Sequence, residues 1–277
     1  MLKGWMLVLL TLFIGAVGIA QSVDALVTQA QALLPNRYIP ENLRLAIDLL
    51  EQALALAPDR VDLMAQLAQL HYELAIITED LEAKRREFRR GADLGFTALG
   101  FDGLAGAKGA GAEEFEELIR AAEDVAALYW TAKCWGMLVD SGGIVAQLNA
   151  LTTAMPRKVR TLYLRALELD EAYFGGGPHE DYGALLVSFT KFHLFGATLE
   201  EAKAHLDRAI ELALQVGYLI PFITYAERYA VHVGDRALFE ELLRFVLAAP
   251  IGDWPFWNRH AKAQAEALLA RADELFR

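Results

Sequence analysis

One stretch of this sequence combines three glycines, a proline and a histidine, residue types that occur in phosphate-binding, metal-binding and catalytic sites as well as in turns. The stretch "EAYFGGGPHEDYG" (171–183) joins two helix-like segments and carries His179. It is not the zinc-binding pattern His-Glu-x-x-His, because residue 183 is glycine. His193 follows His179 by 14 residues, which is about 21 Å along a helix, so the two cannot share a metal ion directly. We therefore expect no metal site and no cofactor.

The same stretch has the composition of a sharp connection between two helices. Glycines at 175–177 can adopt left-handed backbone values, which end the preceding helix, and Pro178 suits the first turn of the next one. Glu180 and Asp181 would then lie at the positive end of that second helix, where they disfavour an anionic ligand. We expect a tight helix–helix turn in which His179 either caps a helix, the favoured interpretation, or belongs to a docking surface.

Other reactive groups predict no catalysis. Cys134 lies among aromatic and aliphatic residues, which is typical of a buried and inert thiol. The glycine-rich segment 91–111 is not a P-loop, because Ala107 precedes Lys108 and glycine follows it. We expect these glycines to end a helix and form a mobile loop. The mixed charges of 79–90 indicate a solvated helix face. No nucleophile–base pair is identifiable, so we expect no enzyme.

Composition and the first residues suggest an exported protein. The chain has 277 residues and a net charge of −11, which argues against nucleic-acid binding. A charged start followed by an apolar run from Trp5 to Ala20 is the layout of a secretory signal peptide cleaved after Ala20. The alternative is an uncleaved anchor, although the run is short for a membrane span. Cysteine is absent near the cut, so no lipid anchor is expected. We expect residues 1–20 to be the signal peptide and 21–277 a single domain.

Three helical segments repeat one another and predict the fold. Segments 46–58, 159–171 and 202–214 align without a gap, and each places apolar or small residues at i, i+4 and i+7 on one helix face. This spacing is typical of the second helix of a tetratricopeptide repeat, although the intervals are too long for a regular array of about 34 residues. We predict an all-α, irregular tetratricopeptide-like helical-repeat fold (an α-solenoid) of about a dozen helices. The alternative is a helical bundle with similar stripes. The three sets are Ala46/Leu50/Ala53, Val159/Tyr163/Ala166 and Ala202/Leu206/Ala209.

Two motifs carry a resemblance to a known family. "ALELDEAYFGGGPHEDYG" (166–183) and "DVAALYWTAKCWGMLVDSG" (124–142) resemble the TRAP-transporter-associated T-component family, TatT. Segments 84–103 and 257–276 are similar to the arginine-rich helix and the closing helix of that family. The resemblance implies an exported periplasmic protein with tetratricopeptide-like repeats, a solute-binding P subunit of a TRAP transporter as partner, a homotrimer and an apolar channel in each protomer. Many members carry a lipid anchor, which this sequence is not expected to have.

The resemblance also suggests which residues bind a ligand. An aromatic cluster such as "YWTAKCWG" can line an apolar channel, and the alternative is ordinary core packing, which already explains buried Trp and Tyr. The ligand-channel candidates are Tyr129, Trp130, Trp135 and Tyr173, and the motif-turn candidates are Gly175, Gly176, Gly177, Pro178 and His179.

Two functions fit the sequence. In the first, the protein is a T-component that docks the periplasmic P subunit and can hold a hydrophobic small molecule. In the second, it is a general helical scaffold for another exported protein and holds no ligand. An exported hydrolase is a more distant third, for want of a nucleophile and base.

Overall fold

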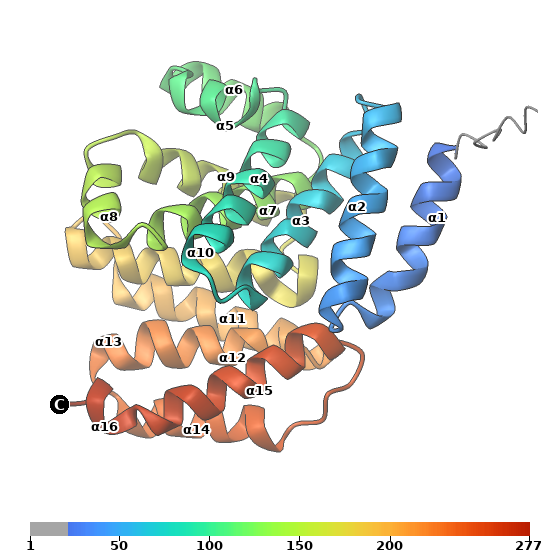
Figure 1. Cartoon of the computed structure of the whole chain (residues 1–277). Coiled ribbons are helices and arrows are strands. Elements are labelled where there is room, and N and C mark those ends of the chain that lie inside the picture. The colour runs from blue at the N-terminus through green and yellow to red at the C-terminus, as the bar shows by residue number, and fades with distance from the viewer. Residues whose placement is uncertain (1–21) are drawn as a thin grey trace, which may run out of the picture.

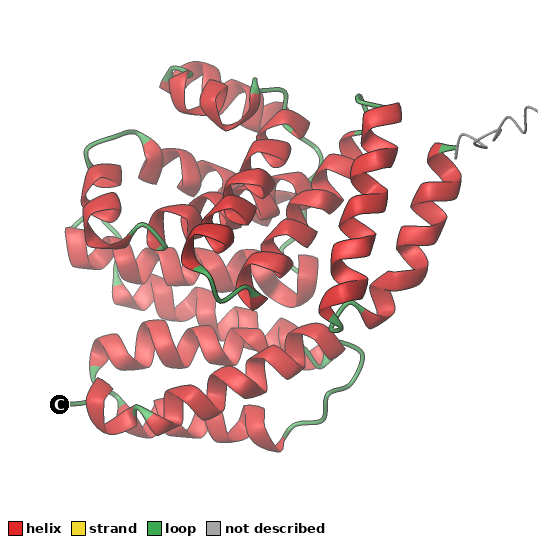
Figure 2. Cartoon of the chain, in the orientation of Figure 1, coloured by secondary structure: helices red, strands yellow, loops and turns green. Residues whose placement is uncertain are grey.

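The computed structural model describes residues 22–277, which form helices joined by short loops (Figures 1 and 2). No strand occurs in this range, so the predicted all-α class is confirmed. None of the helices described has the length and apolar character needed to cross a membrane. The expected signal peptide lies outside the described residues.

The first helices pack as neighbours in chain order, α1 on α2, α2 on α3 and α3 on α4. Capping fixes two of their starts: the side chain of Ser22 accepts a hydrogen bond from the backbone of Ala25, and that of Asp80 accepts one from Ala83. This part comprises α1 (Val23–Leu33), the 3-10 helix η1 (Leu34–Asn36), α2 (Pro40–Leu56), α3 (Val61–Ile77) and α4 (Leu81–Ala98).

The middle of the chain supplies the helices that carry the conspicuous motifs. Helix α7 packs against α3, α4 and α9, and α10 packs along α11. The elements are α5 (Gly103–Gly109), α6 (Ala112–Ala121), α7 (Val125–Asp140), α8 (Gly143–Leu151), α9 (Met155–Leu169), α10 (Tyr173–Phe192) and α11 (Leu199–Val216).

The last helices pack against one another and against α10 and α11, and form the lower layer in Figure 1. Several of these helices are short, so the helices of the described chain are numbered up to α16, whereas the sequence predicts about a dozen. They are α12 (Ile220–Thr224), the π-helical turn η2 (Tyr225–Ala230), α13 (Val231–Val233), α14 (Arg236–Ala248), α15 (Pro255–Ala270) and α16 (Ala272–Leu275).

The glycine-rich segment meets one expectation only in part. Helix α4 ends just before Gly100, whose φ is 87°, but it continues through Gly91 and Gly95, and residues 103–109 form α5 instead of a loop. Gly91 and Gly95 lie where α4 meets α7. A Cβ atom on Gly91 would stand 2.6 Å from the sulfur of Cys134, and one on Gly95 would collide with the side chain of Thr131. Glycine is present here because the two helix backbones approach closely.

The repeated helix faces are buried as the spacing predicts. All nine residues of the three sets, on α2, α9 and α11, belong to the core. Burial of an apolar stripe is equally expected of any amphipathic bundle. The tetratricopeptide-like repeat therefore stays a prediction.

One buried carboxylate joins the two ends of the described chain. Glu73 on α3 is inaccessible to solvent, and its oxygens accept hydrogen bonds from Arg37 at 2.7 Å and from the indole N–H of Trp257 at 3.2 Å. Arg37 also lies over the ring of Phe256. A buried charge needs such partners, so α3, the segment after η1 and α15 depend on one another.

Candidate functional site

The glycine motif forms a sharp left-handed turn near the start of α10. Phe174, Gly175 and Gly176 have φ values of 52°, 68° and 87°, so the helical ribbon is interrupted there. The prediction of left-handed backbone values is right for Gly175 and Gly176 and wrong for Gly177. The third left-handed residue of the turn is Phe174. Gly177 is needed for another reason: a Cβ atom there would stand 2.6 Å from the hydroxyl oxygen of Tyr129.

The turn is in the interior of the protein. Gly175, Gly176, Gly177 and Pro178 are all buried. A Cβ atom on Gly175 would meet the ring of Tyr218 at 3.0 Å. The backbone of the turn from Gly175 to Pro178 therefore serves packing.

His179 was expected to cap a helix, but its side chain bonds other side chains instead. Its Nδ1 lies 2.8 Å from Nδ1 of His205, and its Nε2 lies 3.0 Å from a carboxylate oxygen of Glu171. Glu171 also accepts from Arg208, and this contact, followed by that of His179, lowers the pKa of Glu171 to about 2. Burial, helped by His179, lowers the pKa of His205 to about 4, so that ring is neutral at neutral pH.

These histidines line a shallow pocket of about 330 Å³. Leu164 and Leu167 supply apolar walls, and Glu168 and Glu171 supply carboxylates. Residues 22–277 contain no group of three or more His, Cys, Asp or Glu side chains arranged to hold a metal ion. The pocket is a surface depression that combines apolar walls with carboxylate and imidazole groups.

The second part of α10 carries a buried ion pair that the sequence reading missed. Lys133 on α7 is 5% exposed, and its ammonium donates to both carboxylate oxygens of Asp181 at 2.8 and 2.7 Å. The ammonium lies 3.9 Å from Glu180, which is 1% exposed and accepts a hydrogen bond from Thr224 at 2.6 Å. We call Lys133, Glu180 and Asp181 the buried charge cluster.

Its electrostatics follow from one positive and two negative charges in the interior. Burial, opposed by Lys133 and reinforced by Asp181, raises the pKa of Glu180 to about 7. Burial acts to lower the pKa of Lys133, but Asp181, Tyr72 and Glu180 raise it above its ordinary value. The ammonium therefore stays charged, and Glu180 is the member that titrates near neutral pH.

Three buried oxygens around the turn have no hydrogen-bond partner among residues 22–277. They are Oε2 of Glu180 and the hydroxyls of Tyr129 and Tyr218. Burial raises the pKa of both tyrosines well above the ordinary value, so both hydroxyls keep their protons. Most buried polar groups in proteins are paired, so a group of three unpaired oxygens around one turn is unusual.

Three of the four channel candidates lie together beside the turn. Tyr129 and Trp130 on α7 are inaccessible to solvent, and the indole N–H of Trp130 donates to the hydroxyl of Tyr173 at 3.0 Å. Trp135 lies apart, in edge contact with Phe96 at 5.1 Å between ring centroids. The four residues therefore do not form one aromatic surface.

Phe174 is the centre of this aromatic cluster and was not singled out from sequence. Its ring centroid lies 4.9 Å from Trp130, 4.9 Å from Trp254, 5.4 Å from Trp257 and 5.5 Å from Tyr218. Such edge-to-face distances are those of rings in direct contact. These rings do not line the pocket beside His179, nor the pocket formed by Arg89 and Lys108. The geometry therefore supports core packing as their role.

Cys134 matches the interpretation of an inert thiol. It is inaccessible to solvent, and its sulfur donates weakly to the carbonyl of Ala68 at 3.5 Å. Burial raises the pKa of the thiol well above its ordinary value, with Lys133 opposing the shift, so the reactive thiolate is suppressed.

One signal in the sequence could have located the buried charge cluster. Lys133 stands within "LYWTAKCWGMLV", where its neighbours one turn away are apolar. A lysine on the buried side of a helix requires an acidic partner. The partner could not be identified from spacing, because Asp181 is 48 residues away.

The fold and these contacts define an all-α protein whose most unusual buried features hold helices together around a left-handed turn. The family model for the TRAP transporter T-component matches residues 36–276, and the chain belongs to this family. Comparison with curated proteins gives no match.

Proposed function

We propose that the protein is an exported accessory subunit that docks the periplasmic solute-binding P subunit of a TRAP transporter. The observation that carries this proposal is the family match, which extends from the end of η1 to the C-terminal helices. A transporter component of this kind suggests a role in association and not in catalysis. Export through a cleaved signal peptide and a periplasmic location complete the proposal.

The second part of the proposal, an apolar ligand, receives less support from the geometry. The rings of Tyr129, Trp130 and Tyr173 contact one another and Phe174, so a ligand among them would have to displace aromatic contacts. Trp135 belongs to another aromatic group. We therefore rest the proposed function on docking and treat ligand binding and a homotrimer as separate measurements.

A capture experiment tests the docking proposal. Tagged protein comprising residues 21–277 is incubated with periplasmic extract, and bound proteins are identified by mass spectrometry. We expect a TRAP P subunit, with saturable binding when that subunit is purified. Reproducible capture of a different exported protein, without any TRAP component, would favour the general scaffold. Native mass spectrometry of the same sample reports the oligomeric state and any bound apolar molecule.

The variant His179→Ala tests whether the P subunit docks at the pocket beside the turn. Because the turn is buried and His179 bonds His205 and Glu171, we expect a loss of stability of about 1 kcal/mol, the usual value for lost side-chain hydrogen bonds. Binding of the P subunit should be unchanged. Binding weakened at least tenfold at an unchanged melting temperature would instead place the docking surface at this pocket.

A further inference from the structure

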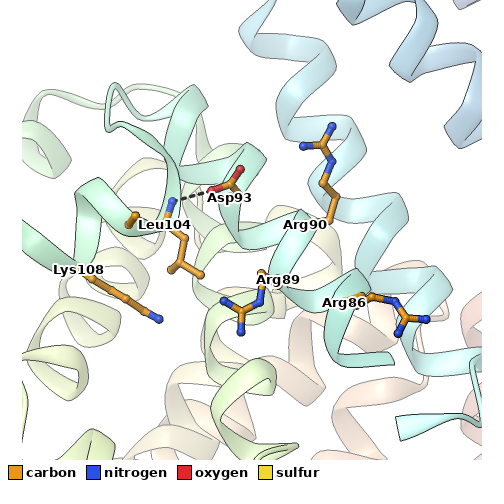
Figure 3. A pocket seen from close by; sticks show the side chains of 7 residues that line it. Arg86, Arg89, Arg90, Asp93, Leu104 and Lys108 are labelled. Carbon is orange, nitrogen blue, oxygen red and sulfur yellow. Dashed lines mark hydrogen bonds between the residues drawn. The ribbon is translucent and has the colours of Figure 1, made fainter. Parts of the chain in front are cut away.

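A second pocket lies between α4 and α5, far from the turn in sequence and of opposite electrical character (Figure 3). It has a volume of about 430 Å³ and an apolar floor that includes Leu104. Asp93 on α4 accepts a hydrogen bond from the backbone N–H of Leu104 at 3.0 Å. Gly103 permits this contact, since a side chain there would collide with the carboxylate of Asp93. The two walls of the pocket are thus tied together.

The charges of the pocket are predominantly positive. Arg86, Arg89 and Arg90 line it from α4, and Lys108 lines it from α5. Arg90 forms an ion pair with Glu51 at 3.3 Å. Arg86, Arg89 and Lys108 are exposed and form no ion pair with any carboxylate in the described part of the chain. Figure 3 shows Arg89 and Lys108 reaching from their two helices toward the same space.

This concentration of unpaired cations is unexpected for a chain whose net charge is −11. Elsewhere most arginines are paired, as Arg208 is with Glu171 and Arg236 with Glu240. The exposed arginines agree with the solvated helix face that the charge run 79–90 predicts. In addition, cations from two tied helices line one concavity.

The chemistry of these side chains selects an anion. A guanidinium presents a planar fork of N–H donors that fits a carboxylate or a phosphate, and a lysine adds a compact positive charge. The volume falls within the range of roughly 300–1,000 Å³ that is usual for small-molecule sites. A long polyanion would be repelled by the net negative charge of the protein. The pocket is therefore matched to a small molecule.

We propose that this pocket binds a small anion that carries at least two carboxylate or phosphate groups, held mainly by Arg89 and Lys108. Arg86 supplies a further positive charge at the edge, and Leu104 accommodates a short apolar part of the ligand. The proposal does not depend on docking of a P subunit, and the two can fail separately.

Titration calorimetry with citrate and with inorganic phosphate tests the proposal, in a low-salt buffer free of other polyvalent anions. We expect saturable binding of one or both probes by the wild-type protein. The double variant Arg89→Gln/Lys108→Gln should bind at least tenfold more weakly. The matched control is Arg44→Gln, which removes one exposed arginine of α2 that does not line the pocket, and its affinity should equal that of the wild type.

Further measurements distinguish a specific anion site from non-specific attraction by positive charge. Arg89→Lys keeps the charge but loses the fork, so it should bind with an affinity between those of the wild type and the double variant. Acetate, with one charge, should bind much more weakly than citrate. Equal affinity in the wild type and the double variant would overturn the proposal, as would binding to phosphatidylglycerol vesicles without saturable binding of either free probe. Capture of the P subunit by the double variant reports docking independently.

Discussion

The buried charge cluster differs from the pocket lined by Arg89 and Lys108, the cationic pocket, in how positive charge is accommodated. Lys133 is almost inaccessible to solvent and is held by Asp181 through two hydrogen bonds, with Glu180 close by. Arg89 and Lys108 are exposed and have no ion pair among residues 22–277. A charge in the interior needs a partner of opposite charge within the protein, whereas an exposed charge can be solvated by water. The first region is therefore committed to stability, and the second is available to a ligand.

The largest effect is expected when the buried cluster loses its only positive charge. Lys133→Met leaves Asp181 and Glu180 without their cation, and breaking one side of a buried pair typically costs about 3–5 kcal/mol. Urea unfolding measures this loss. The control Lys203→Met removes an exposed partner of Asp207, 2.7 Å away, and should cost less than about 1 kcal/mol. Similar losses in the two variants would show that burial does not distinguish these pairs.

The pH dependence of stability should follow Glu180. Its pKa is about 7 in the folded protein and 4.5 ordinarily, so between these values the folded state binds more protons than the unfolded state. Stability contributed by this group is thus present below pH 4.5 and is lost as pH rises through 7. Relative to Glu180→Gln, the wild type should lose roughly 1–3 kcal/mol across this window.

Chemical unfolding of both proteins at several pH values measures this difference. The other titratable groups are the same in both proteins, so the difference between the two curves reports Glu180. Parallel stability curves for the wild type and Glu180→Gln would contradict the assignment of the titration to this carboxyl group.

A smaller difference is expected between two glycine variants, one of them in the turn that precedes the buried charge cluster. Gly176 and Gly217 both have left-handed φ values, 87° and 69°. A Cβ atom on Gly176 would stand 3.1 Å from the carbonyl oxygen of Ala209, whereas nothing lies within 4 Å of one on Gly217. Both alanine variants should pay the left-handed penalty of about 1–2 kcal/mol. Gly176→Ala should cost about 1–2 kcal/mol more through overpacking.

Thermal or urea unfolding of the two glycine variants measures this difference. Equal costs would mean that backbone conformation alone explains the glycine at 176.

The smallest effect on stability is expected in the cationic pocket. Arg89→Gln/Lys108→Gln removes two exposed charges that form no ion pair with the described residues. The free energy of unfolding should change by less than about 0.5 kcal/mol, as for most surface substitutions. It should rise slightly if mutual repulsion of the cations is significant. A loss of more than about 2 kcal/mol would show that these side chains support the fold.

Local chemistry made the helices and the turn predictable, because capping residues, prolines and apolar periodicity act within a few residues. The left-handed values at Gly175 and Gly176 follow from this chemistry. Pairings across the fold were not accessible in the same way. The partner of Lys133 lies on another helix, and so does the residue that excludes a side chain at Gly95.

The candidate site was predicted less well than the fold. Tyr129, Trp130 and Tyr173 do meet, but Trp135 points to a different aromatic group, because residues five positions apart on α7 face different neighbours. Phe174 was overlooked because a bulky residue is not expected to adopt a left-handed conformation. The cationic pocket could not be predicted, since it needs Lys108 of α5 beside Arg89 of α4.

The contacts of Glu73 bear on the order in which the protein is made. The partner indole belongs to Trp257, 184 residues further along the chain. A growing polypeptide on the ribosome therefore carries this glutamate through the synthesis of 184 further residues before the Trp257 donor is present. Contacts of such long sequence separation form late and slow folding. The contacts around Glu73 therefore cannot be complete before α15 has been synthesised.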